Sequence, residues 1–219
     1  MISFEKIKQD EAVRTYIERA DASLAALGYT EHSYAHVTSV ATTSARILET
    51  LGYDSHTVEL AKIAGYLHDI GNLVNRTQHS QSGALMAFRL LDKMGAEPCD
   101  VATVVTAIGN HDEGTGVPVD AVSAALILAD KSDVRRSRVR NCDFSTFDIH
   151  DRVNYSVSES SLEINKEDRV ATLSLTIDTE ISPIMDYFEI FLERMLLCRK
   201  AAERLELAFS LVINEQKII

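Results

Sequence analysis

Leu67-His68-Asp69-Ile70-Gly71 is the stretch that decides how this sequence is interpreted, because it sets an imidazole beside a carboxylate within a helical pattern. Apolar residues recur at helical spacing just before the pair: Val58, Ala61, Ala64 and Leu67. We expect a helix that begins after Asp54-Ser55, a plausible N-cap, and runs to Gly71. A polar group buried without a partner costs about 2–7 kcal/mol. His68 and Asp69 therefore need partners from elsewhere in the chain.

Helical periodicity extends in both directions from this segment and covers the first two thirds of the chain. The other expected helices cover residues 7–27, 34–51, 80–94, 98–108 and 121–136. A glycine directly follows each of the first four, as is common at helix C-termini. Asp120 is the expected cap of the last helix, which we expect to continue towards Arg136.

The pattern changes after about residue 140. Alternating apolar residues predict strands at residues 153–157, 162–164, 171–177 and 209–213, with a turn at residues 165–168. Ser182-Pro183 is typical of the N-cap and first residue of a long helix. The sequence therefore predicts a mainly α protein, with a helical domain over residues 1–140. Residues 141–219 are expected to form an extension packed on it, made of a small antiparallel β-sheet and a long helix.

Composition and charge exclude several classes of protein. The chain has 219 residues, which suits one domain or one domain with an appendage. Its net charge of −11 disfavours binding to duplex nucleic acid. No apolar run approaches the ~20 residues of a membrane span. The three cysteines form no CxxC pair and the N-terminus has no signal-like apolar core, so a cytoplasmic location is expected.

Six polar residues fall where the helical patterns require apolar ones. They are His36, His68, Asp69, His79, His111 and Asp130. Burial of all six is tolerable only if they satisfy one another or share a metal centre. Imidazole and carboxylate ligands without thiolate suit a divalent transition metal, with Fe, Mn, Zn or Ni expected rather than calcium. The set can hold one or two ions; with one, His79 and His111 would contact phosphate instead.

The order of these residues resembles the HD superfamily of metal-dependent phosphohydrolases, whose mark is an early His, a His-Asp pair and a late Asp. Leu67–Gly71 resembles the central motif, Ala129-Asp130-Lys131 the closing one, and His36 the opening ligand. His79 is similar to the additional histidine of binuclear members. The resemblance implies a helical bundle and assigns all six residues above as metal ligands.

Three positions depart from the family pattern. Asn72 stands where a lysine often follows the central motif. In the loop at residues 110–118, Asn110 replaces a histidine before His111, and Val117 replaces a tyrosine. This loop is a weakened form of that in cyclic-dinucleotide phosphodiesterases. The symmetric dinucleoside-tetraphosphate hydrolases are at least as close an analogy.

From this resemblance we expect a metal-dependent phosphohydrolase that cleaves a nucleotide-like or other small phosphate ester or anhydride with a metal-bound hydroxide. The residues interpreted as catalytic are His68, Asp69 and Lys131. Those interpreted as substrate-binding are His111, Arg135 and Arg136, with Arg138 a further candidate. A solvated surface role is the alternative for Lys131 and for each arginine. The expected partner is a small phosphorylated substrate, without duplex nucleic acid or membrane, and a homodimer is left open.

Two other functions stay open at this point. One is a di-iron oxygenase, because some HD-fold proteins use a similar ligand set. The other is a non-catalytic regulatory module that retains a metal to bind a nucleotide. Asp112 and Glu113 are interpreted either as partners that orient His111 or as plain loop residues. The remaining histidines, which are His32, His56 and His150, are interpreted as surface residues.

Overall fold

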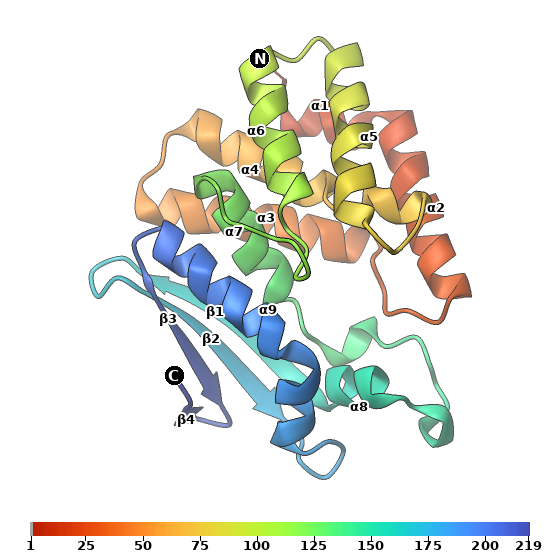
Figure 1. Ribbon diagram of the computed structural model, residues 1–219, viewed down its shortest axis with the longest axis vertical. Coiled ribbons are helices and arrows are strands. Elements are labelled where there is room, and N and C mark those ends of the chain that lie inside the picture. The colour runs from red at the N-terminus through yellow and green to blue at the C-terminus, as the bar shows by residue number, and fades with distance from the viewer. Residues whose placement is uncertain (1) are drawn as a thin grey trace.

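The computed structural model describes residues 2–219, which form a bundle of helices beside a smaller sheet (Figure 1). The bundle comprises α1 (Phe4–Gln9), α2 (Glu11–Ala26), α3 (Tyr34–Leu51), α4 (Ser55–Leu67), α5 (His79–Lys93), α6 (Pro98–Gly109) and α7 (Ala121–Lys131). A short 3₁₀ helix, η1 (Ile70–Leu73), links α4 to α5. The predicted mainly α fold is confirmed.

Side-chain caps explain where several of these helices begin. The Asp54 carboxylate accepts hydrogen bonds from two backbone amides at the start of α4, and Ser33 caps α3. Asp120 and Ser123 form a reciprocal capping box at the start of α7. Gly52 ends α3 with φ at 88°, a left-handed conformation that costs glycine little. The caps predicted at Asp54 and Asp120 are therefore confirmed.

Three of the expected helices in the bundle differ from the prediction by more than one residue. The first expected helix is divided at Asp10, whose extended backbone and side-chain cap on Val13 begin α2 as a separate helix. Helix α4 ends at Leu67 rather than at Gly71. Helix α7 ends at Lys131 and does not continue towards Arg136, because the Ser132 hydroxyl donates to the carbonyl of Ala129 and closes the last turn.

The chain after residue 140 contains one wrongly predicted strand. Residues 149–156 form α8 (Ile149–Ser156), because the Asp148 carboxylate caps a helix there, and strand β1 (Val157–Asn165) begins only afterwards. The hairpin between β1 and β2 (Val170–Ile177) is confirmed. The long helix α9 (Ile184–Arg204) begins one residue later than expected, with Pro183 at the N-cap position.

The sheet is mixed rather than wholly antiparallel, which corrects the prediction. Its order is β1-β2-β3-β4, with β3 (Ala208–Ile213) parallel to β2 and β4 (Gln216–Lys217) antiparallel to β3. Parallel neighbours need a long crossover connection, and α9 supplies it between β2 and β3. The alternating pattern in β3 could not reveal the direction of its neighbour.

Helix α9 lies between the bundle and the sheet (Figure 1). It packs against α7 on one side and against β3 on the other, and its buried residues include Tyr187, Phe191 and Met195. One hydrophobic core contains residues from α2, α7, α9 and the sheet. The division of the chain at residue 140 into a domain and an extension stays a prediction.

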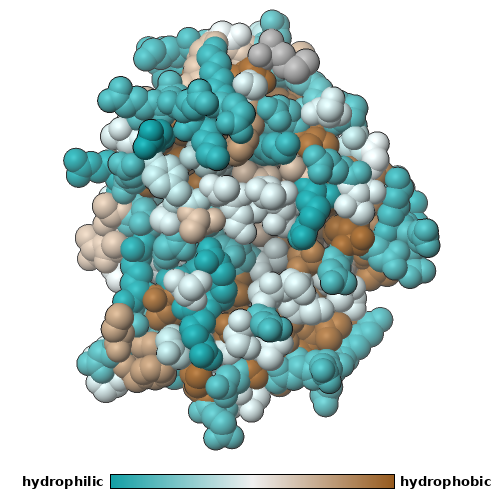
Figure 2. Space-filling model, turned by 180° about the vertical axis from the view of Figure 1, so that it is seen from behind, coloured by the Kyte–Doolittle hydropathy of each residue, from teal (hydrophilic) through white to brown (hydrophobic). Residues whose placement is uncertain are grey.

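Hydrophilic residues cover most of the face seen in Figure 2, and hydrophobic residues appear there as separate small patches. Within residues 2–219, none of the helices combines the length and hydropathy that a bilayer crossing requires.

At Gly71, the backbone of η1 lies in close contact with the backbone of α5. A Cβ atom added there would lie 1.9 Å from the carbonyl oxygen of His79 and 2.4 Å from the amide nitrogen of Gly83. We therefore predict that Gly71→Ala lowers the free energy of unfolding by at least ~1–3 kcal/mol, measured by urea denaturation. Gly114→Ala is the control, because a Cβ there meets nothing within 4 Å. Equal stability of the two variants would contradict this packing.

Candidate metal centre

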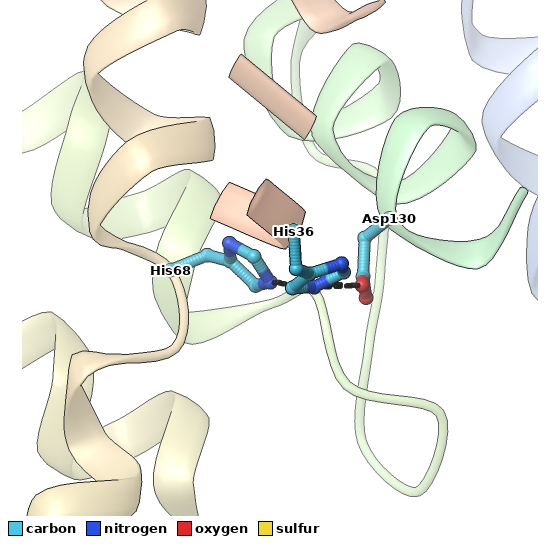
Figure 3. Close-up of side chains that lie close together, drawn as sticks. All are labelled: His36, His68 and Asp130. Atoms are coloured by element: carbon cyan, nitrogen blue, oxygen red, sulfur yellow. Dashed lines mark hydrogen bonds and ion pairs between the residues drawn. The ribbon is translucent and has the colours of Figure 1, made fainter. Parts of the chain in front are cut away.

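Six polar side chains from five segments of the bundle meet at one place. His36 comes from α3, His68 and Asp69 from the end of α4, His79 from the start of α5, His111 from just after α6, and Asp130 from α7. The four imidazoles and Asp69 are buried, and the Asp130 side chain is 12% exposed. Figure 3 shows three of them, His36, His68 and Asp130, with their side chains turned toward one another.

The donor atoms of one subset have the spacing of ligands around a single ion. His36 Nε2 lies 3.3 Å from His68 Nε2, 3.4 Å from Asp130 Oδ1 and 3.4 Å from Asp69 Oδ2. His68 Nε2 lies 3.1 Å from Asp69 Oδ2. Ligands bonded to a transition metal at ~2.0–2.2 Å lie roughly 3–3.6 Å from one another, depending on the coordination angle. These residues therefore fit a metal ion without rearrangement.

The other histidines form a second subset around the opposite oxygen of Asp69. His79 Nε2 lies 3.2 Å from His111 Nε2 and 3.6 Å from Asp69 Oδ1. Suitable donor atoms of His68, Asp69 and His111 also lie within 4.8 Å of one another. Asp69 thus offers one oxygen to each subset, as a carboxylate that bridges two ions would. The arrangement accommodates either one or two ions.

Three of the histidines share a hydrogen bond from ring Nδ1 to the backbone carbonyl three residues earlier. The acceptors for His68, His79 and His111 are Gly65, Arg76 and Ile108, at 2.8, 3.1 and 2.7 Å. A carbonyl oxygen can only accept, so Nδ1 carries the proton in each ring. In the neutral ring, Nε2 then presents a lone pair to the centre.

Asp133 does the same for His36, because its Oδ2 lies 2.6 Å from His36 Nδ1. Such a carboxylate fixes ring orientation and strengthens the imidazole as a ligand. Burial alone would raise the pKa of Asp133, but its contacts with His36 and Arg138 hold that pKa well below its usual range. Asp133 therefore stays ionised beside His36.

The centre is unsatisfied without a cation. With neutral rings, the two pairs of Nε2 atoms that face each other at 3.3 and 3.2 Å present lone pairs that cannot bond to one another, and a proton on His68 would satisfy only the first pair. Asp69 Oδ2 is buried without a hydrogen-bond partner among the described residues. Buried polar atoms are normally paired, and those left over often mark an ion or water. A divalent cation would satisfy the lone pairs and the carboxylate oxygen together.

The charges of the centre also favour a bound cation. Burial alone would lower the pKa of His68, but the Asp69 and Asp130 carboxylates outweigh it and raise that pKa to about 10. Burial lowers the pKa of His79, and burial together with the nearby His68 lowers that of His111. The latter two rings stay neutral, the form that binds metals. The carboxylates around His68 thus attract a positive charge, whereas His79 and His111 offer neutral ligands.

A buried ion-pair chain joins Asp130 to α9. Asp130 Oδ2 lies 2.7 Å from Lys131 Nζ, which lies 3.3 Å from Glu113 Oε2. Glu113 Oε1 then accepts a hydrogen bond from Arg194 Nε at 2.9 Å. Lys131 is therefore neither free nor in solvent. It holds one oxygen of Asp130 and leaves the other facing His36 and His68.

A cleft of about 1140 Å³ opens beside the centre. Its wall includes Asp69, His79, Asp130 and Lys131 from the centre, together with residues of α8 and α9. Three arginines also line it: Arg76, Arg138 and Arg194. The cleft therefore carries basic groups beside acidic ones, which include Asp151 of α8 and Glu189 and Glu193 of α9.

The structure does not bring Arg135 and Arg136 to this cleft. Arg135 pairs with Asp133 and with Glu31, and Arg136 donates to the carbonyl of Tyr155 and lies over its ring. The expected helix would have carried them past Asp130, but α7 ends at Lys131 and the chain turns. Their assignment to substrate is unsupported by their placement.

Sequence reasoning missed several residues of the site. His32, interpreted as a surface residue, lines the cleft and packs its ring against that of His36 with centroids 5.3 Å apart. His150 also lines the cleft, whereas His56 pairs with Asp100 outside it. Asp133 and Arg76 gave no signal in the sequence, because no periodic pattern or motif marks a residue in a turn. Glu113, interpreted either as a partner that orients His111 or as a plain loop residue, pairs instead with Lys131 and Arg194.

Two comparisons with known proteins bear on this geometry. The sequence pattern of the HD domain matches residues 33–189, which is more than half of the chain and includes all six residues of the centre. The chain is also similar to the uncharacterized protein MJ1020 of Methanocaldococcus jannaschii. The two are 26% identical over 185 residues, covering 73% of this chain and 68% of the relative.

Metal binding should release a proton at neutral pH. The pKa of His68 without a cation is raised to about 10, so its ring is protonated at pH 7 and must lose that proton to bind a metal. Affinity for Mn²⁺ should then increase as the pH rises from 6 to 8. Calorimetry in buffers of different ionisation enthalpy measures the protons released. Binding that neither releases protons nor strengthens with pH would contradict this account of His68.

Asp133→Asn should weaken metal binding by about 10–100-fold, because the amide supports His36 less well than the carboxylate does. The matched control is Asp100→Asn, which alters another His–Asp pair, with His56, outside the cleft. Titration of both variants with Mn²⁺ measures the difference. Equal affinities would show that Asp133 does not support the centre.

Proposed function

This chain belongs to the HD domain family, and we propose that it is a metal-dependent phosphohydrolase acting on a nucleotide-like or other small phosphate ester or anhydride. The observation that carries the proposal is the pair of facing subsets around Asp69, which offers Oδ2 to His36 and His68 and Oδ1 to His79. That arrangement suits one or two divalent transition metals, with Fe, Mn, Zn or Ni the best matches to its donors.

Electrostatics support an anionic substrate. The two aspartates of the centre carry −2 and its histidines are neutral as ligands, so a pair of divalent cations leaves the centre positive. When bound, such cations polarise a phosphoryl oxygen and lower the pKa of water to near neutrality. The substrate is then drawn to the centre although the chain has a net charge of −11. The same net charge disfavours duplex nucleic acid as a substrate.

The protein's own residues position the reacting groups. Asp69 would hold the cations through both of its oxygens, with Oδ2 beside His36 and His68 and Oδ1 beside His79. Lys131 keeps Asp130 oriented by holding its Oδ2 at 2.7 Å. The four rings, fixed through their Nδ1 hydrogens, need no reorganisation when the substrate arrives. A cytoplasmic location and a homodimer stay predictions.

A phosphate-release assay tests the function. Purified protein with added Mn²⁺ should release phosphate from a panel of nucleotides and generic phosphate esters. We predict that His68→Ala and Asp69→Asn lose bound metal and at least 99% of this activity, because each removes donor atoms of the centre. The release should continue without oxygen, which separates hydrolysis from oxygenase chemistry.

The control is His56→Ala, which removes a histidine outside the cleft and should leave activity unchanged. Circular dichroism establishes that each variant is folded. Full activity of Asp69→Asn would rule out the assigned role of Asp69. A folded, metal-loaded wild-type protein that cleaves no member of the panel would count against the phosphohydrolase and favour a binding module.

A further inference from the structure

Basic side chains in the cleft differ in how they are already engaged. Lys131 is held by Asp130 and Glu113, and Arg194 by Glu113. Arg138 donates to the backbone carbonyls of Glu31 and Asp133. Of the arginines and lysines that line the cleft in the described part of the chain, Arg76 is the one that makes no ion pair. Its charge is therefore available to a ligand.

Arg76 is placed close to the metal centre by two hydrogen bonds in series. Its Nη1 donates to Asn72 Oδ1 at 3.3 Å, and Asn72 Nδ2 donates to Asp69 Oδ1 at 3.0 Å. The guanidinium thus lies one side chain beyond Asp69. The guanidinium is near enough to contact a molecule bound at the metal centre, but it forms no ion pair with the Asp69 carboxylate.

Tyr29 supports the guanidinium from the other side. The carbon of the guanidinium lies 5.7 Å from the centroid of the Tyr29 ring, within the range of a cation–π contact. Tyr29 also lines the cleft and is 44% exposed. One face of the guanidinium is therefore held against an aromatic ring, and most of its five hydrogen donors stay unused. A planar fork of this kind matches the oxygens of a phosphate.

We propose that Arg76 binds a second phosphate of the substrate, next to the phosphate that lies at the metal centre. This inference rests on the proposed function and narrows its substrate to molecules with at least two linked phosphates. The cleft has room for both, because its volume of about 1140 Å³ exceeds the ~300–1,000 Å³ typical of small-molecule sites.

The test uses two inorganic probes, phosphate and pyrophosphate, titrated into the Mn²⁺-loaded protein. Free Mn²⁺ is kept in excess, so that chelation by pyrophosphate is the same for every variant. We expect Arg76→Gln to weaken pyrophosphate binding at least tenfold and phosphate binding less than threefold. Arg76→Lys should give an intermediate loss for pyrophosphate, because it keeps the charge without the fork.

Two controls accompany the titration. Arg89→Gln removes an exposed arginine of α5 that does not line the cleft, and it should change neither affinity. Elemental analysis should find the same metal content in Arg76→Gln as in the wild type, because the backbone carbonyl of Arg76, and not its side chain, supports His79.

Each other outcome decides against a specific claim. Unchanged pyrophosphate binding by Arg76→Gln would overturn the second phosphate site and leave the phosphohydrolase intact. Equal losses for both probes would also overturn it, because Arg76 would then act on the phosphate at the metal centre. If the metal-loaded wild-type protein bound neither probe, the proposed function itself would fail.

Discussion

The hydrogen bond at Nδ1 of each buried histidine is the interaction on which the site depends. Three backbone carbonyls and the Asp133 carboxylate hold the ring protons on the outer side, so the four Nε2 lone pairs converge. Converging lone pairs and a bare carboxylate oxygen in a buried place are costly. The empty centre therefore costs free energy of folding, and a bound cation would offset that cost. Metal binding at the cleft and stability of the bundle are linked in this way.

Much of the bundle could be predicted from the sequence, because local chemistry determines helix ends. The carboxylates of Asp54 and Asp120 cap helices wherever they precede an apolar periodic run, and Gly52 ends one. The convergence of the histidines could also be inferred, because buried imidazoles on separate apolar faces must find common partners. Their order along the chain then indicated the HD family, and the match over residues 33–189 shows it.

What the sequence could not predict depends on tertiary geometry. A one-turn difference in the length of α7 separated the predicted arginines from the cleft. The Ser132 hydroxyl that closes the last turn does not predict this end, because serine makes the same bond within helices that continue. Arg76 and Asp133 lie in connections between helices, where periodicity carries no information. Strand direction was equally hidden, because the alternation in β3 is the same whether its neighbour is parallel or antiparallel.

Anomalous scattering from crystals grown or soaked with Mn²⁺ tests the central claim most directly, because it locates the ion and counts it. The account predicts at least one peak within bonding distance of His36 Nε2, His68 Nε2 and an oxygen of Asp69 or Asp130. A second peak beside His79 and His111 would establish a binuclear centre. Well-ordered crystals with these side chains in the same place and no peak among them would contradict it.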